Sequence, residues 1–510
     1  MNHTMTIVPL LWQMIMAITL VFCWRIPHRH RLVSIIGGVV GVGLSAALLL
    51  QVLTHGIVTM QAGNWPAPFG ITMVADTFSA TLVVLTSIAG LCVSIFSIHA
   101  LLDNRINFGY FPVLHFLLMG LSGAFVAGDI FNLYVWFEIM IISSFVLLSL
   151  GGQKQQLEGA VKYFTLNMLA SIIFLTAVAI LYGLTGTLNM ADLAGKMVLV
   201  ENKTLVRITA IIFLAGFGIK AAIFPLYFWL PASYHTPPAP VSAIFGGLLT
   251  KVGVYAMVRV FTLVFPPDPF FSDLLLSLGI LTVVTGGLGA AIQFNIQRLF
   301  AYLIICHIGY MVVGIGFGGK LALAGVVFYM IHDIVVKTSL FLSGGLIYQL
   351  EGQWDRRKMG GLYADHPWLS LLIIIPLFSL VGIPPLSGFW PKVSLIIGGL
   401  ELRQYWGVGA ILLGSFLTLV IIAKLWSDVF WRRGGDPVQR EGFPYYGKMK
   451  RRQQAALLAP IVVLAAISLY IGFGAAHIQW LSERIASELT NPAGYIDAVL
   501  HPAIQKGGVP

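Results

Sequence analysis

Long apolar runs dominate this chain and constrain its fold more than any other feature. Of its 510 residues, 58% are hydrophobic and only 10% are charged, whereas soluble domains carry about 25% charged residues. A run of roughly 20 apolar residues is long enough to cross a bilayer as a helix. The pattern therefore predicts an all-α, polytopic membrane protein.

The sequence contains about fourteen such runs, separated by polar, Pro-containing or Gly-containing breaks. The expected spans are 4–24, 32–54, 71–100, 108–127, 129–150, 157–184, 207–230, 237–262, 271–292, 298–317, 321–349, 368–398, 405–430 and 453–480. No stretch between them is long enough for a soluble domain, so we predict one membrane domain over 1–510. The first run precedes the basic segment RIPHRHR, the reverse of a cleavable signal peptide's order, and is expected to remain as a helix.

The net charge of +10 orients the chain in a membrane and does not indicate nucleic-acid binding. The loops and helix ends of one side carry 17 basic residues: Arg25, Arg29, Arg31, Arg105, Lys154, Lys162, Arg298, Arg356, Arg357, Lys358, Arg432, Arg433, Arg440, Lys448, Lys450, Arg451 and Arg452. The other side carries 8: Lys196, Lys203, Arg207, Arg259, Lys320, Arg403, Arg484 and Lys506. Cytoplasmic loops are the richer in Lys and Arg, so the first set is expected in the cytoplasm and both termini outside.

The remaining basic residues lie inside apolar helices, and all are lysines: Lys220, Lys251, Lys337, Lys392 and Lys424. A buried lysine can lose its proton when desolvation lowers its pKa, whereas arginine stays charged. Lys424 is interpreted as a lysine that extends to the headgroups and pairs with Asp428, one turn further on. Lys220 lies about 15–20 Å from either helix end, so a protein interior or a water-filled path must receive it.

Other ionisable groups extend this pattern. Glu138 lies deep in DIFNLYVWFEIMIISSF, either in a structural salt bridge or in a titrating pair with a membrane lysine. His307 and His332 also lie in apolar helices and are either satisfied core residues or members of a proton relay. Asp333 stands one turn before Lys337, where a purely structural pair is possible.

Prolines interrupt two of the expected helices near lysines. Pro225 and Pro231 follow Lys220, and the segment GIPPLSGFWPK places Pro384, Pro385 and Pro391 just before Lys392. Proline opens the helical hydrogen-bond ladder, which is tolerated at membrane depth where protein or water satisfies the freed carbonyls. The two interrupted segments, five helices apart, are either ordinary kinks or the broken helices of a structural repeat.

Several chemistries are excluded. The three cysteines, Cys23, Cys92 and Cys306, form no CxxC, so iron–sulfur, zinc and disulfide frameworks are not expected. The chain has no P-loop, dinucleotide-binding fingerprint, nucleophile elbow or metal-ligand cluster. We therefore predict neither an enzyme nor a cofactor protein.

Five blocks of the sequence resemble the antiporter-like subunits shared by respiratory complex I, membrane-bound hydrogenases and Mrp multisubunit cation/proton antiporters. They are GDIFNLYVWFEIMIISSF, GIKAAIFPLYFWLPASYHTPPAPVSAIFGGLLTKVGVYA, RLFAYLIICHIGY, HDIVVKTSLF and GIPPLSGFWPK. NWPAPFGI, HTPPAPVSA, HDIVVKT and the lysine that ends GIPPLSGFWPK are most similar to the D-type branch of the Mrp antiporter subunits. In one complex I homologue the position of Lys392 holds a glutamate.

The resemblance implies fourteen helices with two inverted five-helix repeats, over 108–262 and 271–430, in which helices seven and twelve are broken. Residues 1–100 would form helices one to three, and residues 453–510 the last helix and a tail. Glu138 resembles the family glutamate that pairs with the seventh-helix lysine, here Lys220. Lys251 resembles the central eighth-helix lysine and Lys392 the terminal one.

The histidine region departs from the family pattern in two places. His307 matches the histidine of the family's AYxxxxHxG block, where Leu303 and Ile304 replace common serines. In some relatives a histidine lies four residues before Lys337, where this chain has Asp333 and, next to it, His332.

The resulting functional expectation is a proton-translocating subunit of an Na⁺/H⁺ antiporter in a prokaryotic cell membrane. The proton-motive force would drive it, and its partners would be other Mrp antiporter subunits, an A-like chain and small membrane proteins. One alternative is a proton-pumping subunit of NADH–quinone oxidoreductase or a membrane-bound hydrogenase. Another is a scaffold subunit that transports nothing.

Overall fold

The structure is a computed structural model that describes residues 3–23, 27–433 and 445–501. Arg25, Arg440 and Lys506, which entered the charge comparison, lie outside these residues. The first thirteen α-helices are α1 (Val8–Phe22), α2 (Pro27–His55), α3 (Thr77–Ala100), α4 (Asp103–Asn107), α5 (Tyr110–Val126), α6 (Ile130–Ser149), α7 (Lys154–Thr185), α8 (Met190–Leu199), α9 (Lys203–Ala221), α10 (Trp229–Ser233), α11 (Ala239–Ile244), α12 (Thr250–Leu263) and α13 (Pro269–Ala291). The others are α14 (Ile296–Phe317), α15 (Lys320–Glu351), α16 (Leu362–Asp365), α17 (Pro367–Val381), α18 (Phe389–Glu401), α19 (Tyr405–Trp426), α20 (Arg451–Phe473), α21 (Ala475–Thr490) and α22 (Ala493–Leu500).

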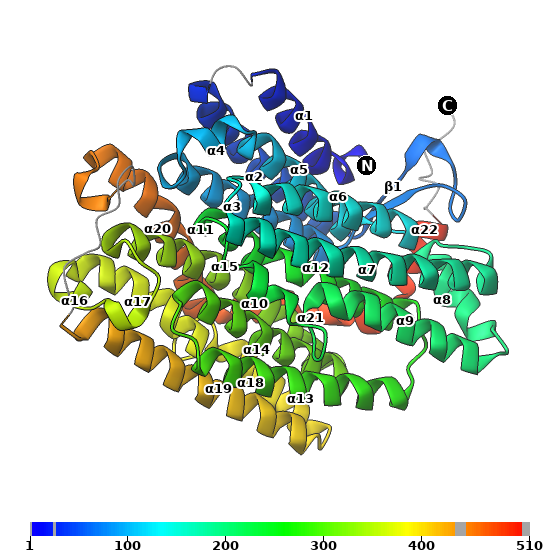
Figure 1. Ribbon diagram of the computed structural model, residues 1–510. Helices are drawn as coiled ribbons and strands as arrows, with labels where there is room; N and C mark the ends of the chain where they lie inside the picture. Colours follow the sequence, from blue (N-terminus) through cyan, green and yellow to red (C-terminus); the bar gives the residue numbers. More distant parts are fainter. Residues whose placement is uncertain (1–2, 24–26, 434–444, 502–510) are drawn as a thin grey trace.

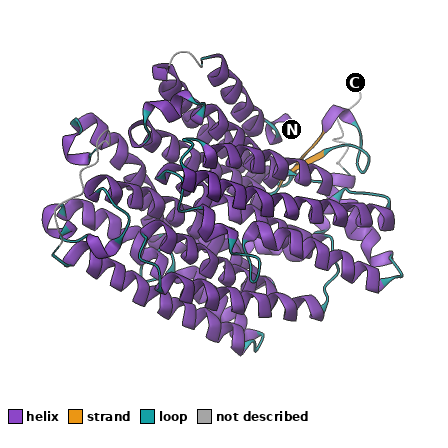
Figure 2. Ribbon diagram, in the orientation of Figure 1, coloured by secondary structure: helices purple, strands orange, loops and turns teal. Residues whose placement is uncertain are grey.

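Six short helical turns and two strands complete the described chain. The turns are η1 (His3–Thr6), η2 (Ala62–Asn64), η3 (Phe245–Leu249), η4 (Arg356–Lys358), η5 (Ser427–Trp431) and η6 (Tyr446–Lys448), and the strands are β1 (Val58–Gln61) and β2 (Thr72–Ala75). Figure 2 shows a bundle that is almost entirely helical. The all-α expectation is confirmed.

Within the described ranges, 11 helices are long and apolar enough to cross a membrane, and three shorter apolar helices, α1, α5 and α17, accompany them. The count of fourteen spans stays a prediction. The buried helices carry apolar residues on all sides, as expected where protein surrounds them: in α14 and α15, 94% of the most apolar window is buried.

Two expected spans are wrong at their ends. Residues 71–75 belong not to a helix but to a hairpin in which Val58 pairs with Ala75, and α3 begins only after Asp76. Asp76 and Ser79 form a reciprocal capping box there, which satisfies amides that the first helical turn leaves free. The last expected span, 453–480, is too long: its helix, α20, ends at Phe473, and the chain continues in α21 and α22.

The bundle has two opposite ends. At one end, η1 and α22 both pack against β1, so the first and last described elements lie together near the hairpin (Figure 1). We call this end the hairpin face. At the other end of α3, Arg31, His99 and Lys448 line one cavity, and we call this end the basic face.

Two segments of the chain repeat each other's backbone with a constant offset of 166 residues. An antiparallel bridge joins Asp129 to Asn189, and another joins Asn295 to Asp355. Helices α7 and α15 each have 32 residues, and each ends at a left-handed glycine, Gly186 or Gly352.

The first bridge lies on the hairpin face, where Asp129 accepts a hydrogen bond from the Thr72 amide. The second lies at the basic face, because Asn295 and Arg105 line one cavity there. Equivalent elements thus point in opposite directions. This arrangement is the inverted repeat that the resemblance implied.

Both repeats contain a broken helix, as expected. Helix α9 ends at Ala222, whose φ is 61°, and α17 ends at Gly382, whose φ is 86°. Each helix is followed by a non-helical turn before a second helical piece, α10 or α18. The expected continuous span 207–230 is therefore interrupted at 222–228, and the backbone groups freed there become available to side chains.

Candidate functional site: a buried chain of ionisable side chains

Lys220 lies at the end of α9, next to the first helix break. Its side chain is 5% exposed, and its ammonium donates a hydrogen bond to Ser171 Oγ at 3.1 Å. The ammonium also lies 4.6 Å from the centre of the Phe137 ring. A hydroxyl and an aromatic face both stabilise a cation without adding a negative charge, so this lysine is held by neutral groups.

Glu138 does not meet Lys220 directly. Its Oε1 is buried and has no hydrogen-bond partner within the described chain, while the neighbouring side chain, Phe137, occupies the contact with the ammonium. The two charges still interact electrostatically through the bundle. A change of charge at either member is therefore felt at the other.

Lys251 lies at the centre of the bundle and is completely buried. Its ammonium is 2.6 Å from Asp333 Oδ2 and donates to the carbonyl of Gly246 at 2.7 Å. Gly246 belongs to the π-helical turn η3. Such wide turns leave carbonyls without their usual i+4 partners, and here one of these carbonyls binds the lysine.

Asp333 of α15 also approaches His307 of α14. Its Oδ1 lies 3.5 Å from His307 Nδ1, and the Tyr329 hydroxyl lies 2.9 Å from the same nitrogen. All of these groups are fully buried. The possible helical pair of Asp333 with Lys337 is wrong as a direct contact, because the carboxylate turns to Lys251.

Lys337 follows Asp333 by one turn of α15. Its side chain is 0% exposed, and its ammonium makes no hydrogen bond to any described residue. A buried charge without a partner is costly.

His332 points in another direction, toward the second helix break. Its Nδ1 lies 2.8 Å from Ser387 Oγ, and Ser387 bonds to Ser468 of α20 at 2.8 Å. Gly388 permits this approach, because a Cβ there would lie 3.0 Å from His332 Nε2 and 1.9 Å from the Ser379 carbonyl oxygen.

Lys392 begins the second half of the other broken helix and is 5% exposed. Its ammonium donates to the carbonyls of Val381 at 2.7 Å and Leu380 at 3.3 Å, and it lies 5.5 Å from the centre of the Tyr310 ring. The carbonyls left free at the end of α17 thus hold the lysine. The negative end of a helix dipole favours a cation at this place.

Lys424 differs from the other four lysines because its side chain is exposed on α19. This agrees with its interpretation as a lysine that extends to the headgroups. Its expected partner is wrong: Asp428 lies 3.1 Å from Arg356 Nη1. Arg356, which was assigned to a loop, is only 1% exposed and attracts the carboxylate into the protein.

The structure brings most of the predicted site residues together, although in two groups. Lys251, His307 and Lys337 gather around Asp333, and His332 and Lys392 lie at the second break. Lys220 and Glu138 form a separate group near the first break. A cavity of 20 Å³ beside Lys220 is lined by Asn167, Tyr234 and Leu249, among others, and has room for about one water molecule.

A larger cavity opens near the basic face, at the segment that follows the first broken helix. Its volume is 320 Å³, and His235, Gln156 and Gln349 contribute to its lining. The side-chain oxygens of both glutamines are buried without a described partner. Polar atoms of this kind are satisfied by water, so the cavity can admit water toward the bundle.

The sequence interpretation missed the neutral members of the site, Ser171, Tyr329 and Ser387. Hydroxyl groups are common in apolar helices, and nothing local distinguished these three. For Ser171 a signal did exist, since it stands 166 residues before Lys337, the offset that relates the two repeats.

These features define a membrane subunit with an inverted repeat and a buried lysine chain, and comparisons with known proteins agree. Residues 127–418 match the family described as NADH:quinone oxidoreductase/Mrp antiporter, TM. The D subunit of the Na⁺/H⁺ antiporter of Alkalihalophilus pseudofirmus is 43% identical over 92% of this chain and 95% of its own length. The Bacillus subtilis protein of the same name is 38% identical over 98% and 99%. The chain belongs to this family, within its branch of Na⁺/H⁺ antiporter D subunits.

Solved structures give the same result. A chain of the Mrp complex from a Dietzia species superposes with a TM-score of 0.89 at 28% identity, covering 98% of this chain and all of that one. A chain of respiratory complex I from Thermus thermophilus superposes with a TM-score of 0.79 at 22% identity, covering 96% and 100%. The second likeness concerns the fold alone.

Proposed function

We propose that this chain is the proton-translocating membrane subunit of a multisubunit Na⁺/H⁺ antiporter driven by the proton-motive force. The residues that carry protons are Glu138, Lys220, Lys251, His307, His332, Lys337 and Lys392. One observation carries the proposal: the buried ion pair of Lys251 and Asp333, 2.6 Å apart, lies one helical turn from a buried lysine without a hydrogen bond.

The central group holds more basic groups than its carboxylate can neutralise. Among the described residues, Asp333 interacts electrostatically with Lys251, Lys337 and His307. Desolvation disfavours every additional positive charge in such a place. The basic groups therefore share fewer protons than they could bind, and the protonation of one determines that of the others.

Protons exchange between this chain of groups and the basic face. Water in the 320 Å³ cavity connects that face with α7 and the first broken helix. Protonation near Glu138 weakens its attraction for Lys220, whose other contacts are neutral. Lys220 then releases its proton toward Tyr234 and the small cavity that both residues line.

A change of charge at Lys220 is felt at Lys251, because charges couple over long distances in a low dielectric. Asp333 then exchanges partners between Lys251 on one side and Lys337 and His307 on the other. Lys392, which carbonyl groups hold at the second break, exchanges the proton at the other end of the chain. Each step uses a group that can both accept and donate a proton.

The membrane arrangement and the partners are part of the proposal. The basic face would lie in the cytoplasm, since basic loops remain there, and the hairpin face with both chain ends would lie outside. The other Mrp subunits would bind this chain in a prokaryotic plasma membrane. The superposition on a chain of the Dietzia Mrp complex supports such an assembly.

Proton pumping within a redox enzyme is the second candidate function. The description of the matching family names NADH:quinone oxidoreductase beside the Mrp antiporter, but the relatives at 43% and 38% identity are antiporter D subunits. The two candidates differ in what drives ion movement: the proton-motive force drives the exchange of Na⁺ for protons in one, and an electron donor is required in the other.

The test uses inverted vesicles that contain the full set of partner subunits, in which an added pump forms a ΔpH. Proton efflux on adding Na⁺, with no electron donor for this complex, is expected for the wild type. The efflux should disappear in Lys220→Ala at matched expression. Proton movement that occurs only with a redox substrate would contradict the antiporter function.

A further inference from the structure

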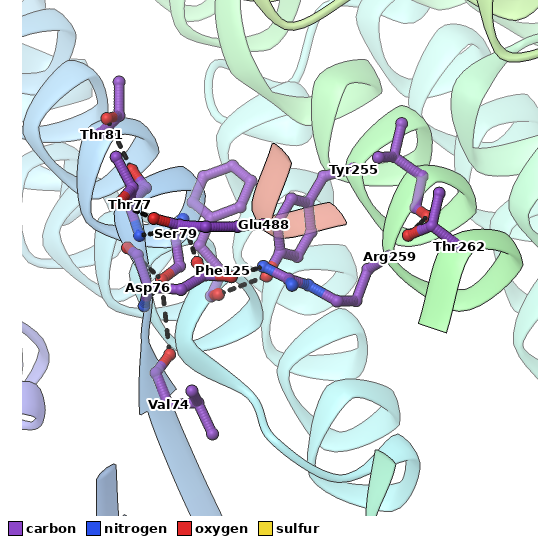
Figure 3. Close-up of polar contacts among 11 residues, drawn as sticks. Val74, Asp76, Thr77, Ser79, Thr81, Phe125, Tyr255, Arg259, Thr262 and Glu488 are labelled. Carbon is purple, nitrogen blue, oxygen red and sulfur yellow. Dashed lines mark hydrogen bonds and ion pairs between the residues drawn. The ribbon is translucent and has the colours of Figure 1, made fainter. Parts of the chain in front are cut away.

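A second group of buried charges lies at the hairpin-face end of α12, apart from the lysine chain. Arg259 is 4% exposed, although the sequence analysis placed it among the loop charges. Its Nη2 lies 2.5 Å from Asp76 Oδ2, and Figure 3 shows the two side chains extending toward each other from α12 and α3. The other carboxylate oxygen of Asp76 accepts the Ser79 amide at 2.8 Å, so both oxygens are occupied.

Three aromatic rings surround the Arg259 guanidinium. Its Cζ lies 5.2 Å from the ring centre of Tyr495, 5.5 Å from that of Tyr255 and 5.9 Å from that of Phe78. The rings come from α22, α12 and α3. They stabilise the cation and at the same time exclude water from it.

A second carboxylate lies beside this group. Glu488 of α21 accepts a hydrogen bond from the Thr77 hydroxyl at 2.6 Å and one from the Thr77 amide at 3.3 Å, as Figure 3 shows in part. Arg484, which is partly exposed, lies 3.3 Å from the same carboxylate. Burial, followed by the nearby Asp76 charge, raises the pKa of Glu488.

Arg259 lies on the same helix as Lys251, nearer the hairpin face. Lys251, Tyr255 and Arg259 follow one another at intervals of four residues and therefore share one side of α12. Their positions span about 12 Å along the helix. The Tyr255 hydroxyl, midway, donates to the Phe125 carbonyl at 2.6 Å.

A relay along this side would need every member to accept a proton and pass it on. A lysine and a tyrosine hydroxyl meet this condition, but an arginine does not, because its guanidinium stays protonated and has no acceptor. We propose that Arg259, held by Asp76 and enclosed by aromatic rings, closes the hairpin-face end of α12 to protons. Protons at Lys251 consequently leave sideways toward Asp333 and do not leak across the membrane.

This inference rests on the proposed function, since it assigns Arg259 a role in the same proton route. A purely structural ion pair that joins α3 to α12 would share the geometry. The two roles differ in one respect: only the closure depends on the inability of the side chain at position 259 to titrate.

The experiment measures the decay of a preformed ΔpH in vesicles with the whole complex, without Na⁺ and after the pump is stopped. Arg259→His places a titratable group between Tyr255 and Asp76 and is expected to give a several-fold faster decay. Adding Lys251→Ala should restore the slow decay, because it removes the start of the route. Arg259→Lys keeps the ion pair and also introduces a titratable group. It is expected to leak less than Arg259→His, and it replaces that variant in the experiment if Arg259→His does not assemble.

Two controls separate the closure from damaged packing. Arg484→His makes the same change at the rim and should leave the decay unchanged. Arg259→Gln combined with Asp76→Asn keeps a polar contact without a titratable group and should not leak.

The inference is overturned if the titratable variants assemble and do not leak, or if the leak survives Lys251→Ala. Since the assay needs no Na⁺, absence of sodium exchange in the wild type would count against the proposed function alone.

Discussion

Helices α7 and α15 have the same length and the same glycine ending, but they carry different chemistry at equivalent positions. Asn167 and Ser171 of α7 stand 166 residues before Asp333 and Lys337 of α15. In the first repeat, Lys220 therefore rests on a hydroxyl. Asp333 of the second repeat instead offers a full negative charge, on which Lys251 rests.

The difference shows how one backbone can serve two roles in a proton route. Neutral neighbours leave Lys220 as a single charge whose state depends on Glu138, which suits a switch. The charged neighbours in α15 make several groups compete for few protons, which suits exchange. The two sites should therefore respond differently to the loss of one group.

Asp333→Asn is expected to have the largest effect. It leaves Lys251 and Lys337 without their carboxylate, and breaking a buried ion pair costs about 3–5 kcal/mol unless the lysines lose their protons. Sodium-dependent proton exchange in vesicles should be abolished, whereas Asn167→Ala, at the equivalent position in α7, should retain part of it. Equal losses in the two variants would break the comparison.

Lys337→Met should separate function from stability. The lysine makes no hydrogen bond to a described residue, and a charge at membrane depth costs about 2.5–3.5 kcal/mol. The variant is therefore expected to melt at a higher temperature than the wild type in detergent, while its exchange activity is lost. A lower melting temperature would mean that Lys337 has a structural partner.

Ser171→Ala should have a smaller effect on the first repeat. It removes the hydrogen bond to the Lys220 ammonium, and a hydrogen bond to a charged group contributes about 1.5–3 kcal/mol. Exchange should slow but persist, since the Phe137 ring still stabilises the cation. Ser143→Ala, which changes a buried serine of α6, provides the matched control and should behave like the wild type. Complete loss of exchange in Ser171→Ala would make the two repeats equally sensitive.

The smallest effect on stability is expected at Asp129. It caps the start of α6, and Asn295 caps α14 at the equivalent position of the second repeat. Burial raises the pKa of Asp129 to about 6, above its ordinary value, so the folded protein prefers the protonated form. The stability that the folded protein gains from protonating Asp129 is fully present below pH 4 and is lost as the pH rises through 6.

Asp129→Asn copies the residue of the second repeat and keeps the cap on α6. The variant should gain stability relative to the wild type between pH 4 and pH 7, by about 1 kcal/mol or less given the cap's retained hydrogen bond. Melting temperatures measured across this range give the answer. A difference that does not change with pH would contradict the assigned titration.

Much of the fold followed from the sequence because apolar length is a local property. The lysines at 220, 251, 337 and 392 were identified in the same way, since a charge within an apolar run is conspicuous. The hairpin of β1 and β2 was missed because its four-residue strands merge with the apolar run that follows. The amphipathic α21 was missed because its polar residues resemble a tail.

The partners of the buried charges could not be predicted, because they come from other helices. The possible pairs within one helix, Asp333 with Lys337 and Lys424 with Asp428, are both replaced by contacts between elements. The burial of Arg259 has the same origin. Its position near a helix end indicated a surface residue, but α3 and α22 cover it.

The most direct test of the central claim compares two lysines within apolar helices, one buried and one exposed. Sodium-triggered proton exchange would be measured in inverted vesicles for Lys251→Ala and Lys424→Ala at matched assembly. The account predicts that exchange is lost in Lys251→Ala, whose side chain pairs with Asp333, and is retained in Lys424→Ala, whose side chain is exposed. Wild-type exchange in Lys251→Ala would contradict the proposal that the buried chain carries the protons.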